Sequence, residues 1–348
     1  MACTHTRSEE SAGIPIRHRD RKAGTAGSWD RRGFLRAAGG CAAHLAMAAA
    51  AAPLRVSSLF AATATARVTQ EVPWGRLEEV SEGIWALVST PLADPTTLCN
   101  GGIIRGHAGV IMVEAFGSPR GAAWMAEQAR ALTGRWPDQV LLTHYHGDHT
   151  GGLPGIFHGE GSDPTPRATA ATRELTRGTA RSREDAALLA ALERVSVLPG
   201  VAPMELDLGG KVVEVRPLEG HTASDLVVEV RDPAVVFCGD LVWNRFFPNY
   251  VDAVPSLLTA SVTALRRDAG VVYIPGHGPL AGAAELQIYL ELLARVEEQA
   301  RRAHASGLNA SEAAREFTLP SPLDEWFLFS DGYPERALGA WLAELGAA

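Results

Sequence analysis

Short apolar runs recur along this 348-residue chain, and most of them end beside a glycine or a polar residue. Runs of this length, rich in Val and Ile, are typical of buried strands. In the first half they predict strands at 78–80, 84–89, 97–105, 110–114 and 140–143. In the second half they predict strands at 204–208, 211–217, 225–230 and 235–238, with a hairpin turn at Gly209 and Gly210.

Apolar residues spaced three to four apart predict helices between and after these strands. We expect helices at about 120–132, 174–195, 255–267 and 283–304, then one that starts at 309–312 and a last one over 335–345. The 174–195 helix carries many charges, so it is expected to cover one face or to act as a lid. The pattern predicts one large two-sheet domain of the α/β class followed by a helical tail.

The segment 143–152 places three imidazoles and a carboxylate within six residues, directly after the apolar run 140–142. These candidate ligands are His144, His146, Asp148 and His149. The first two are two residues apart, so they point the same way if the strand continues and can share one metal. The glycine after them permits a sharp turn that directs the next two toward a second ion. A solvated histidine-rich loop is the alternative reading.

Three later residues have the same setting, at the end of a short apolar run beside a glycine. They are His221, Asp240 and His277. Each alone is weak, because a polar residue after a strand is usually a cap. Neutral imidazole and carboxylate are the ligands that zinc favours in open catalytic sites, so the ordered set predicts a zinc centre.

This ordered set resembles the metallo-β-lactamase superfamily, whose pattern is H-x-H-x-D-H followed by His, Asp and His. The resemblance covers about 77–293 and implies a four-layer αββα sandwich with the site at one edge, between the sheets. It implies two Zn²⁺ per chain, with Asp240 as the bridge. The first ion would be held by His144, His146 and His221, and the second by Asp148, His149 and His277.

Several positions discriminate among branches of this family. His146 favours zinc over iron, because the flavodiiron branch has Glu there, and Asp240 resembles the thioesterase, lactonase and phosphodiesterase branches rather than class B β-lactamases. Segment 239–244 and the tail 307–345 look similar to periplasmic metallohydrolases associated with sulfur oxidation and quinoprotein systems. Glu114 departs from the family, which usually has Asp at this supporting position.

These residues predict a zinc-dependent hydrolase of a small ester, thioester or lactone. Two zinc ions that share a water lower its pKa toward about 7. Asp148 is the predicted catalytic residue, because it would hold its metal and orient the hydroxide. One alternative is a class B-like β-lactamase, and another is a non-catalytic metal-binding accessory protein of a periplasmic redox system.

Residues that follow Asp240 are placed to contact the substrate. The predicted substrate-binding residues are Trp243, Asn244, Arg245 and Phe247. Aromatic walls with one amide and one guanidinium suit a small organic molecule that bears an anionic group. For Trp243 and Phe246, packing beneath the site is an equally weighted alternative.

The N-terminus predicts export. Arg31 and Arg32 precede the alanine-rich run 37–52, and an Ala-x-Ala site follows, which is typical of a removable twin-arginine signal peptide. The run is too short and too rich in alanine to span a membrane. We therefore expect a leader at 1–66, a metallo-β-lactamase-fold domain at 67–305 and a helical tail packed on it at 306–348. The predicted location is the periplasm, and the twin-arginine translocase is the predicted partner during export.

Without residues 1–66 the chain has 23 basic and 36 acidic residues, a net charge of −13. This balance disfavours a nucleic-acid partner and leaves a small-molecule substrate. Lys211 is then the single lysine, and we identify no basic cluster that would grip the glutathione tripeptide. Cys99 and Cys238 lie in apolar runs and are expected to fill core rather than form a disulfide.

Overall fold

The structure is a computed structural model that describes residues 66–157, 163–198, 202–267 and 269–347. Residues 1–65, which hold nearly all of the predicted export leader, lie outside these ranges. Among the helices that are described, none has the length and apolar character needed to cross a membrane.

The first sheet has eight strands in sequence order. They are β1 (Arg67–Val72), β2 (Gly75–Ser81), β3 (Ile84–Ser89), β4 (Gly101–Arg105), β5 (Val110–Val113), β6 (Gln139–Leu141), β7 (Thr165–Ala168) and β8 (Ser196–Val197). Strands β1 to β5 pair antiparallel, and β5 to β8 pair parallel. The parallel part delivers the predicted metal loop, because this loop follows β6.

The second sheet has five strands in the order β13-β12-β11-β10-β9. They are β9 (Met204–Asp207), β10 (Val212–Pro217), β11 (Leu226–Val230), β12 (Val235–Trp243) and β13 (Val272–His277). The β12 and β13 pair is parallel and the others are antiparallel. Gly209 and Gly210, both with positive φ, turn the chain between β9 and β10 as the sequence predicts.

An apolar core joins the two sheets face to face. It includes Ile84, Ile104 and Ile111 from the first sheet and Val213, Val228 and Phe237 from the second. Gly102 is required where the sheets approach most closely, because a Cβ there would lie 2.3 Å from Phe237 Cε1. The alternating side chains of both sheets therefore form one interior, as in other sandwiches.

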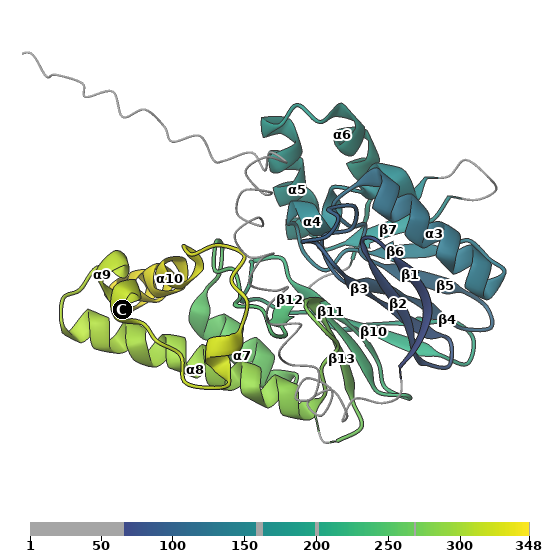
Figure 1. The fold of residues 1–348 in the computed structure, drawn as a ribbon. Helices are drawn as coiled ribbons and strands as arrows, with labels where there is room; N and C mark the ends of the chain where they lie inside the picture. The colour runs from purple at the N-terminus through teal and green to yellow at the C-terminus, as the bar shows by residue number, and fades with distance from the viewer. Residues whose placement is uncertain (1–65, 158–162, 199–201, 268, 348) are drawn as a thin grey trace, which may run out of the picture. The chain divides into compact units, whose positions relative to one another are not determined.

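Helices cover the outer faces of the sandwich (Figure 1). The first sheet is covered by α3 (Pro119–Thr133), α5 (Ala170–Ser182) and α6 (Ala186–Leu192), and the second by α7 (Pro255–Ala264) and α8 (Ala283–Ala305). Helices α9 (Ala310–Glu316) and α10 (Tyr333–Ala347) pack on α8 and share its core cluster. The predicted four-layer αββα sandwich with C-terminal helices is confirmed.

Two details differ from the sequence prediction. The single helix expected over 174–195 is two helices, because Glu184 has φ +55 and Asp185 caps α6 by accepting from the Leu188 N–H. The strand expected over 97–105 begins only at Gly101. Both α5 and α6 contribute to the core beneath the first sheet, through Ala180 and Leu188, so this segment packs as a covering layer.

Candidate metal centre

The metal loop leaves β6 and turns into the short helix α4 (Gly147–Thr150). The strand ends at Leu141, so His144 and His146 lie in the loop rather than on a continued strand, which corrects the reason given for their shared direction. The His146 carbonyl accepts from the His149 and Thr150 N–H groups at 3.0 Å each. This turn folds the second pair of candidate ligands back toward the first.

One group of predicted ligands lies around Asp240 Oδ2. His221 Nε2 is 3.0 Å from His146 Nδ1 and 3.4 Å from this oxygen, and His144 Nε2 is 3.9 Å from it. One nitrogen or oxygen from each of the four residues lies within 4.8 Å of the others. These are the three histidines and the carboxylate expected around the first ion.

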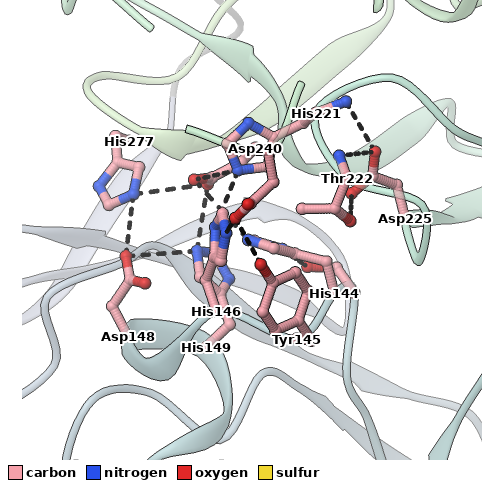
Figure 2. Close-up of polar contacts among 12 residues, drawn as sticks. His144, Tyr145, His146, Asp148, His149, His221, Thr222, Asp225, Asp240 and His277 are labelled. Carbon is pink, nitrogen blue, oxygen red and sulfur yellow. Dashed lines mark hydrogen bonds and ion pairs between the residues drawn. The ribbon is translucent and has the colours of Figure 1, made fainter. Parts of the chain in front are cut away.

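The second group lies around the other oxygen of the same carboxylate. Asp240 Oδ1 is 3.1 Å from His149 Nε2 and 3.4 Å from His277 Nε2, and Asp148 Oδ2 is 3.2 Å from His277 Nε2. These four residues also bring one ligand atom each within 4.8 Å of one another. Figure 2 shows Asp240 between the two groups, so the structure brings all seven predicted ligands together in the expected division.

Three of these residues come from the second sheet. His221 lies in the loop between β10 and β11, Asp240 lies within β12, and His277 ends the neighbouring strand β13. Gly276 is required by this arrangement, because a Cβ there would lie 1.9 Å from Asp240 Oδ1. The glycine before His277 therefore makes room for the ligand of the adjacent strand, whereas Gly239 and Gly220 make room for Thr143 and Leu258.

Burial sets the charge of the ligands. It lowers the pKa of His144 well below its usual value and that of His221 to about 3, so both imidazoles are neutral at physiological pH. Burial raises the pKa of Asp240, but the charges of His277 and His149 outweigh it and hold that pKa well below the usual range. Neutral imidazole and ionised carboxylate are the forms that bind metal, so His144, His221 and Asp240 are already in these forms. Burial lowers the pKa of His277, but nearby carboxylates outweigh it and raise that pKa to about 9, so this ligand loses a proton when a metal binds.

The environment of the buried Nε2 atom of His144 indicates whether metal ions fit this site. His144 Nε2 is inaccessible to solvent, and the described residues offer it no hydrogen-bond partner. A buried polar atom left in this state costs about 1–3 kcal/mol. A metal ion that accepts its lone pair removes this cost, so the residues fit the two ions that the sequence predicts.

Asp252 supports His146 and was not predicted. Its Oδ2 lies 2.8 Å from His146 Nε2 and accepts a hydrogen bond from the Tyr145 hydroxyl. A proton on Nε2 leaves the lone pair of His146 Nδ1 free to bind a metal. Carboxylates commonly orient metal-binding histidines in this way. The residue lies in the loop between β12 and α7, outside the strand-and-glycine pattern that revealed the ligands.

Glu114 lies beside His149 in an ion-pair contact rather than a hydrogen bond. Its Oε1 lies 3.1 Å from His149 Nδ1 and accepts from the Thr143 hydroxyl at 2.5 Å. The residue has φ +78, an uncommon conformation that places its longer side chain under the metal loop. The replacement of the usual Asp by Glu therefore keeps the supporting contact.

Asp225 holds the loop that carries His221 (Figure 2). Its carboxylate accepts from the N–H groups of His221 and Thr222, at 2.9 and 2.8 Å, and from the Thr222 hydroxyl at 2.6 Å. Burial raises the pKa of Asp225 to about 7, although these hydrogen bonds oppose the rise. Asp225 thus gives the His221 loop a buried carboxylate, as Glu114 does for His149.

The predicted substrate-binding residues occupy different environments. The Trp243 ring lies 4.1 Å from the His277 ring and is almost fully buried. Asn244 is also buried, and its Nδ2 donates to the carbonyls of Pro279 and Leu280 at 3.1 Å each. Asn244 therefore fixes the loop after His277, which corrects its predicted contact with substrate.

Phe247 is fully buried and its ring lies 6.2 Å from that of Phe317, in the core against the C-terminal helices. This packing corrects its predicted place in the pocket. Arg245 has φ +63, is partly exposed, and its carbonyl accepts from the Phe327 N–H at 3.0 Å. The sequence after Asp240 thus supports the site and connects it to the C-terminal segment.

Both predicted core cysteines are free and buried. Burial raises the pKa of the Cys99 thiol to about 12, so it is neutral beside His149. The prediction that they fill core is confirmed, and the described residues contain no disulfide.

A family model described as the metallo-β-lactamase superfamily matches residues 95–277, which include all seven ligands. The chain belongs to this superfamily. Its membership and the two His and Asp clusters support a metal-binding hydrolase. The expected resemblance is therefore confirmed at the level of family and fold.

Two curated relatives are hydroxyacylglutathione hydrolases. The protein from Acidiphilium cryptum is 31% identical over 164 residues, which are 47% of this chain and 59% of the relative. The protein from Idiomarina loihiensis is 21% identical over 207 residues, 58% of this chain and 67% of the relative. The chain thus matches about three-fifths of the length of the first relative.

Solved structures show the same fold at low identity. The sec-alkylsulfatase Pisa1 from Pseudomonas sp. is 18% identical with a TM-score of 0.58, over 76% of this chain and 50% of that one. The structure named VMB-1 is 20% identical with a TM-score of 0.52, over 64% of this chain and 98% of that one.

Proposed function

We propose that this chain is a hydrolase of small thioesters and esters that works with two metal ions, preferably zinc, held by the seven predicted ligands. The observation that carries the proposal is the position of Asp240, whose two oxygens face separate ligand groups at 3.1–3.9 Å. A structural zinc site is closed by four ligands around one ion. Two adjoining groups that share a carboxylate are suited to a catalytic pair instead.

When bound, such an ion pair supplies a hydroxide nucleophile near neutral pH and polarises the substrate carbonyl. The residues of the chain orient the reaction. Asp148 has 27% of its side chain exposed, whereas His149 and His277 beside it are buried, so its carboxylate borders the side from which substrate and water enter. At this border Asp148 can accept a hydrogen bond from the attacking water and fix its direction.

The choice of thioesters rests on the relatives and on Asp240. The two curated relatives are named for a glutathione thioester. Class B β-lactamases usually have Cys or Ser where this chain has Asp240. The predicted lack of a basic cluster for the glutathione tripeptide favours a thioester with another thiol or a simple ester.

The test is a hydrolysis panel with purified, zinc-loaded protein. The substrates are acyl thioesters, including S-lactoylglutathione, with aryl esters, lactones, phosphodiesters and β-lactams. We expect turnover of thioesters or esters that His146→Ala abolishes. Turnover of β-lactams should be slower by at least about tenfold, a barrier difference of about 1.4 kcal/mol.

Two results would redirect the assignment. Preferred turnover of β-lactams would make the chain a β-lactamase. Inactivity across the panel with both ions bound would favour the accessory-protein alternative.

We also propose that the chain acts in the periplasm after twin-arginine export. The support is the sequence alone: the arginine pair Arg31 and Arg32, the alanine-rich run after it and the Ala-x-Ala site. The acidic balance of residues 67–348 fits a small-molecule substrate rather than a nucleic acid.

A further inference from the structure

A cleft of about 450 Å³ begins next to the second group of ligands. It is lined by Arg76, Val88, Ser89, Phe246, Gly278 and Pro279. Gly278 directly follows the ligand His277, so one wall of the cleft continues from the metal centre. The volume falls within the roughly 300–1,000 Å³ typical of small-molecule sites.

The C-terminal segment extends this wall with aromatic rings. Phe327 pairs in a parallel bridge with Phe246, which lies three residues after the end of β12. The Phe329 ring stacks on Phe246 with centroids 5.0 Å apart and planes 20° apart, and its centroid lies 5.9 Å from that of His277. Phe246, Phe327 and Phe329 are all partly exposed. A surface of aromatic rings thus leads from the cleft to the metal centre.

The lining of the cleft also includes Arg76, whose guanidinium charge is balanced. Arg76 Nε and Nη2 lie 3.1 and 3.0 Å from Glu78 Oε1, while 48% of the Arg76 side chain is exposed. This pairing holds the guanidinium in place and leaves little net charge for a free anion. A planar guanidinium of this kind stacks well on an aromatic ring.

We propose that this cleft binds a planar, apolar group of the substrate, such as an aryl group, next to the scissile bond. The Phe246 ring and the Arg76 guanidinium in the lining, with Phe329 stacked on Phe246, suit a flat ring better than a saturated one. The inference rests on the proposed function, because it names the substrate class of the same site. Phe246, Phe329 and Arg76 are then residues that determine specificity.

Matched substrates test the planar preference. S-benzyl thioacetate is compared with S-cyclohexylmethyl thioacetate, and S-ethyl phenylthioacetate with S-ethyl cyclohexylthioacetate, where each pair exchanges a flat ring for a saturated one. Each kcat/KM is divided by the alkaline hydrolysis rate constant of the same compound, because the two members also differ in leaving-group or acyl reactivity. In at least one pair we expect this corrected kcat/KM to be about tenfold higher for the aryl member, since ring stacking contributes on this scale. Equal values within both pairs, with hydrolysis of both, would overturn the inference and leave the proposed function intact.

Two variants then show which residues cause the preference for aryl substrates. Phe329→Leu keeps an apolar side chain but removes the flat face, and should reduce the aryl preference to about one. Phe317→Leu removes a ring from the same C-terminal region, where it packs on Phe247, and should leave the preference unchanged. An equal loss in both variants, or in neither, would contradict the assigned site.

A binding measurement separates this inference from catalysis. Benzyl ethyl sulfide and cyclohexylmethyl ethyl sulfide cannot be hydrolysed, so their binding can be compared by saturation-transfer NMR even if no thioester is turned over. We expect binding of the benzyl compound, weakened in Phe329→Leu but not in Phe317→Leu. Equal binding of both sulfides would overturn the inference whatever the activity.

Discussion

Asp240 connects the two ligand groups at the level of single residues. Its Oδ2 lies 3.4 Å from His221 Nε2, and its Oδ1 lies 3.1 Å from His149 Nε2. The side chain is only 4% exposed, so its negative charge acts on both groups with little screening by solvent.

Asp240→Ala should leave one tightly bound zinc per chain. The first group keeps three histidines, whereas the second loses the carboxylate that it shares. Elemental analysis after dialysis measures this, with Asp324→Ala as a control because Asp324 is exposed in the C-terminal segment. Two zinc ions per chain in Asp240→Ala would contradict a bridging role.

Asp252→Asn should weaken the first metal by about tenfold to a hundredfold, the range found when a carboxylate that orients a metal-binding histidine is replaced. The reason is that Asp252 fixes the proton on His146 Nε2 and frees Nδ1. Competition with a zinc chelator measures the affinity. Tyr145→Phe is the matched control, because it removes the other donor to Asp252 and keeps the carboxylate. Equal affinity in Asp252→Asn and wild type would exclude this positioning role.

The sequence identified the seven ligands because four of them cluster in one short segment after an apolar run, and His221, Asp240 and His277 each follow a glycine after such a run. Asp252 and Phe329 lie in loops without such a signal, and their roles depend on which loops the fold brings together. Phe247 and Asn244 were misplaced for the same reason. Both follow β12 in a loop, and nearness to Asp240 in sequence does not show which way a loop side chain points.

At the level of elements, the parallel pair β12 and β13 positions the bridge and the last histidine. Gly239 pairs with Pro275, and Trp243 pairs with His277. The sequence predicted the start of β12 but ended it at Cys238, whereas the strand runs to Trp243 and includes Asp240. It did not predict β1, β7 or β8, which are short or exposed, nor the break between α5 and α6 at Glu184.

Gly276→Ala should lower metal content and reduce kcat/KM by at least about tenfold, because the new Cβ would meet Asp240 Oδ1 at 1.9 Å and displace it. Gly178→Ala is the matched control. Gly178 lies within α5 with open space around it, so alanine there should stabilise the fold by about 0.5–1 kcal/mol in urea denaturation. Wild-type metal content and activity in Gly276→Ala would contradict this prediction, because they would show that the site tolerates a displaced Asp240 side chain.

At the level of the whole molecule, the sandwich buries its ligands between two sheets and opens beside Asp148 and the C-terminal segment. The C-terminal segment contains α9 and α10, which pack on α8, and it also places Phe329 next to the metal ligand His277. Apolar periodicity predicted most of the strands and helices and the helical tail, and the resemblance to the superfamily implied the four layers. The sequence could not predict that the tail reaches the site, because this contact joins residues more than fifty positions apart.

Replacing Arg31 and Arg32 by Lys should abolish export although the charge is kept, because a twin-arginine signal is recognised through its arginines. Fractionation of cells expressing wild type and the double variant measures this. Replacing Arg17 and Arg19 by Lys is the control, since these residues lie upstream of the motif. If the double variant with Arg31→Lys and Arg32→Lys still reaches the periplasm as mature protein, the export proposal is wrong.

The most direct test of the central claim is a zinc titration of metal-free protein, with hydrolysis of a simple thioester followed at each addition. Two ions that act together should give activity that rises to a plateau at about two equivalents. Asp240→Ala should stay inactive throughout. Thioester hydrolysis that is independent of zinc, or absent with two ions bound, would contradict the proposal that these seven residues form a two-metal hydrolase.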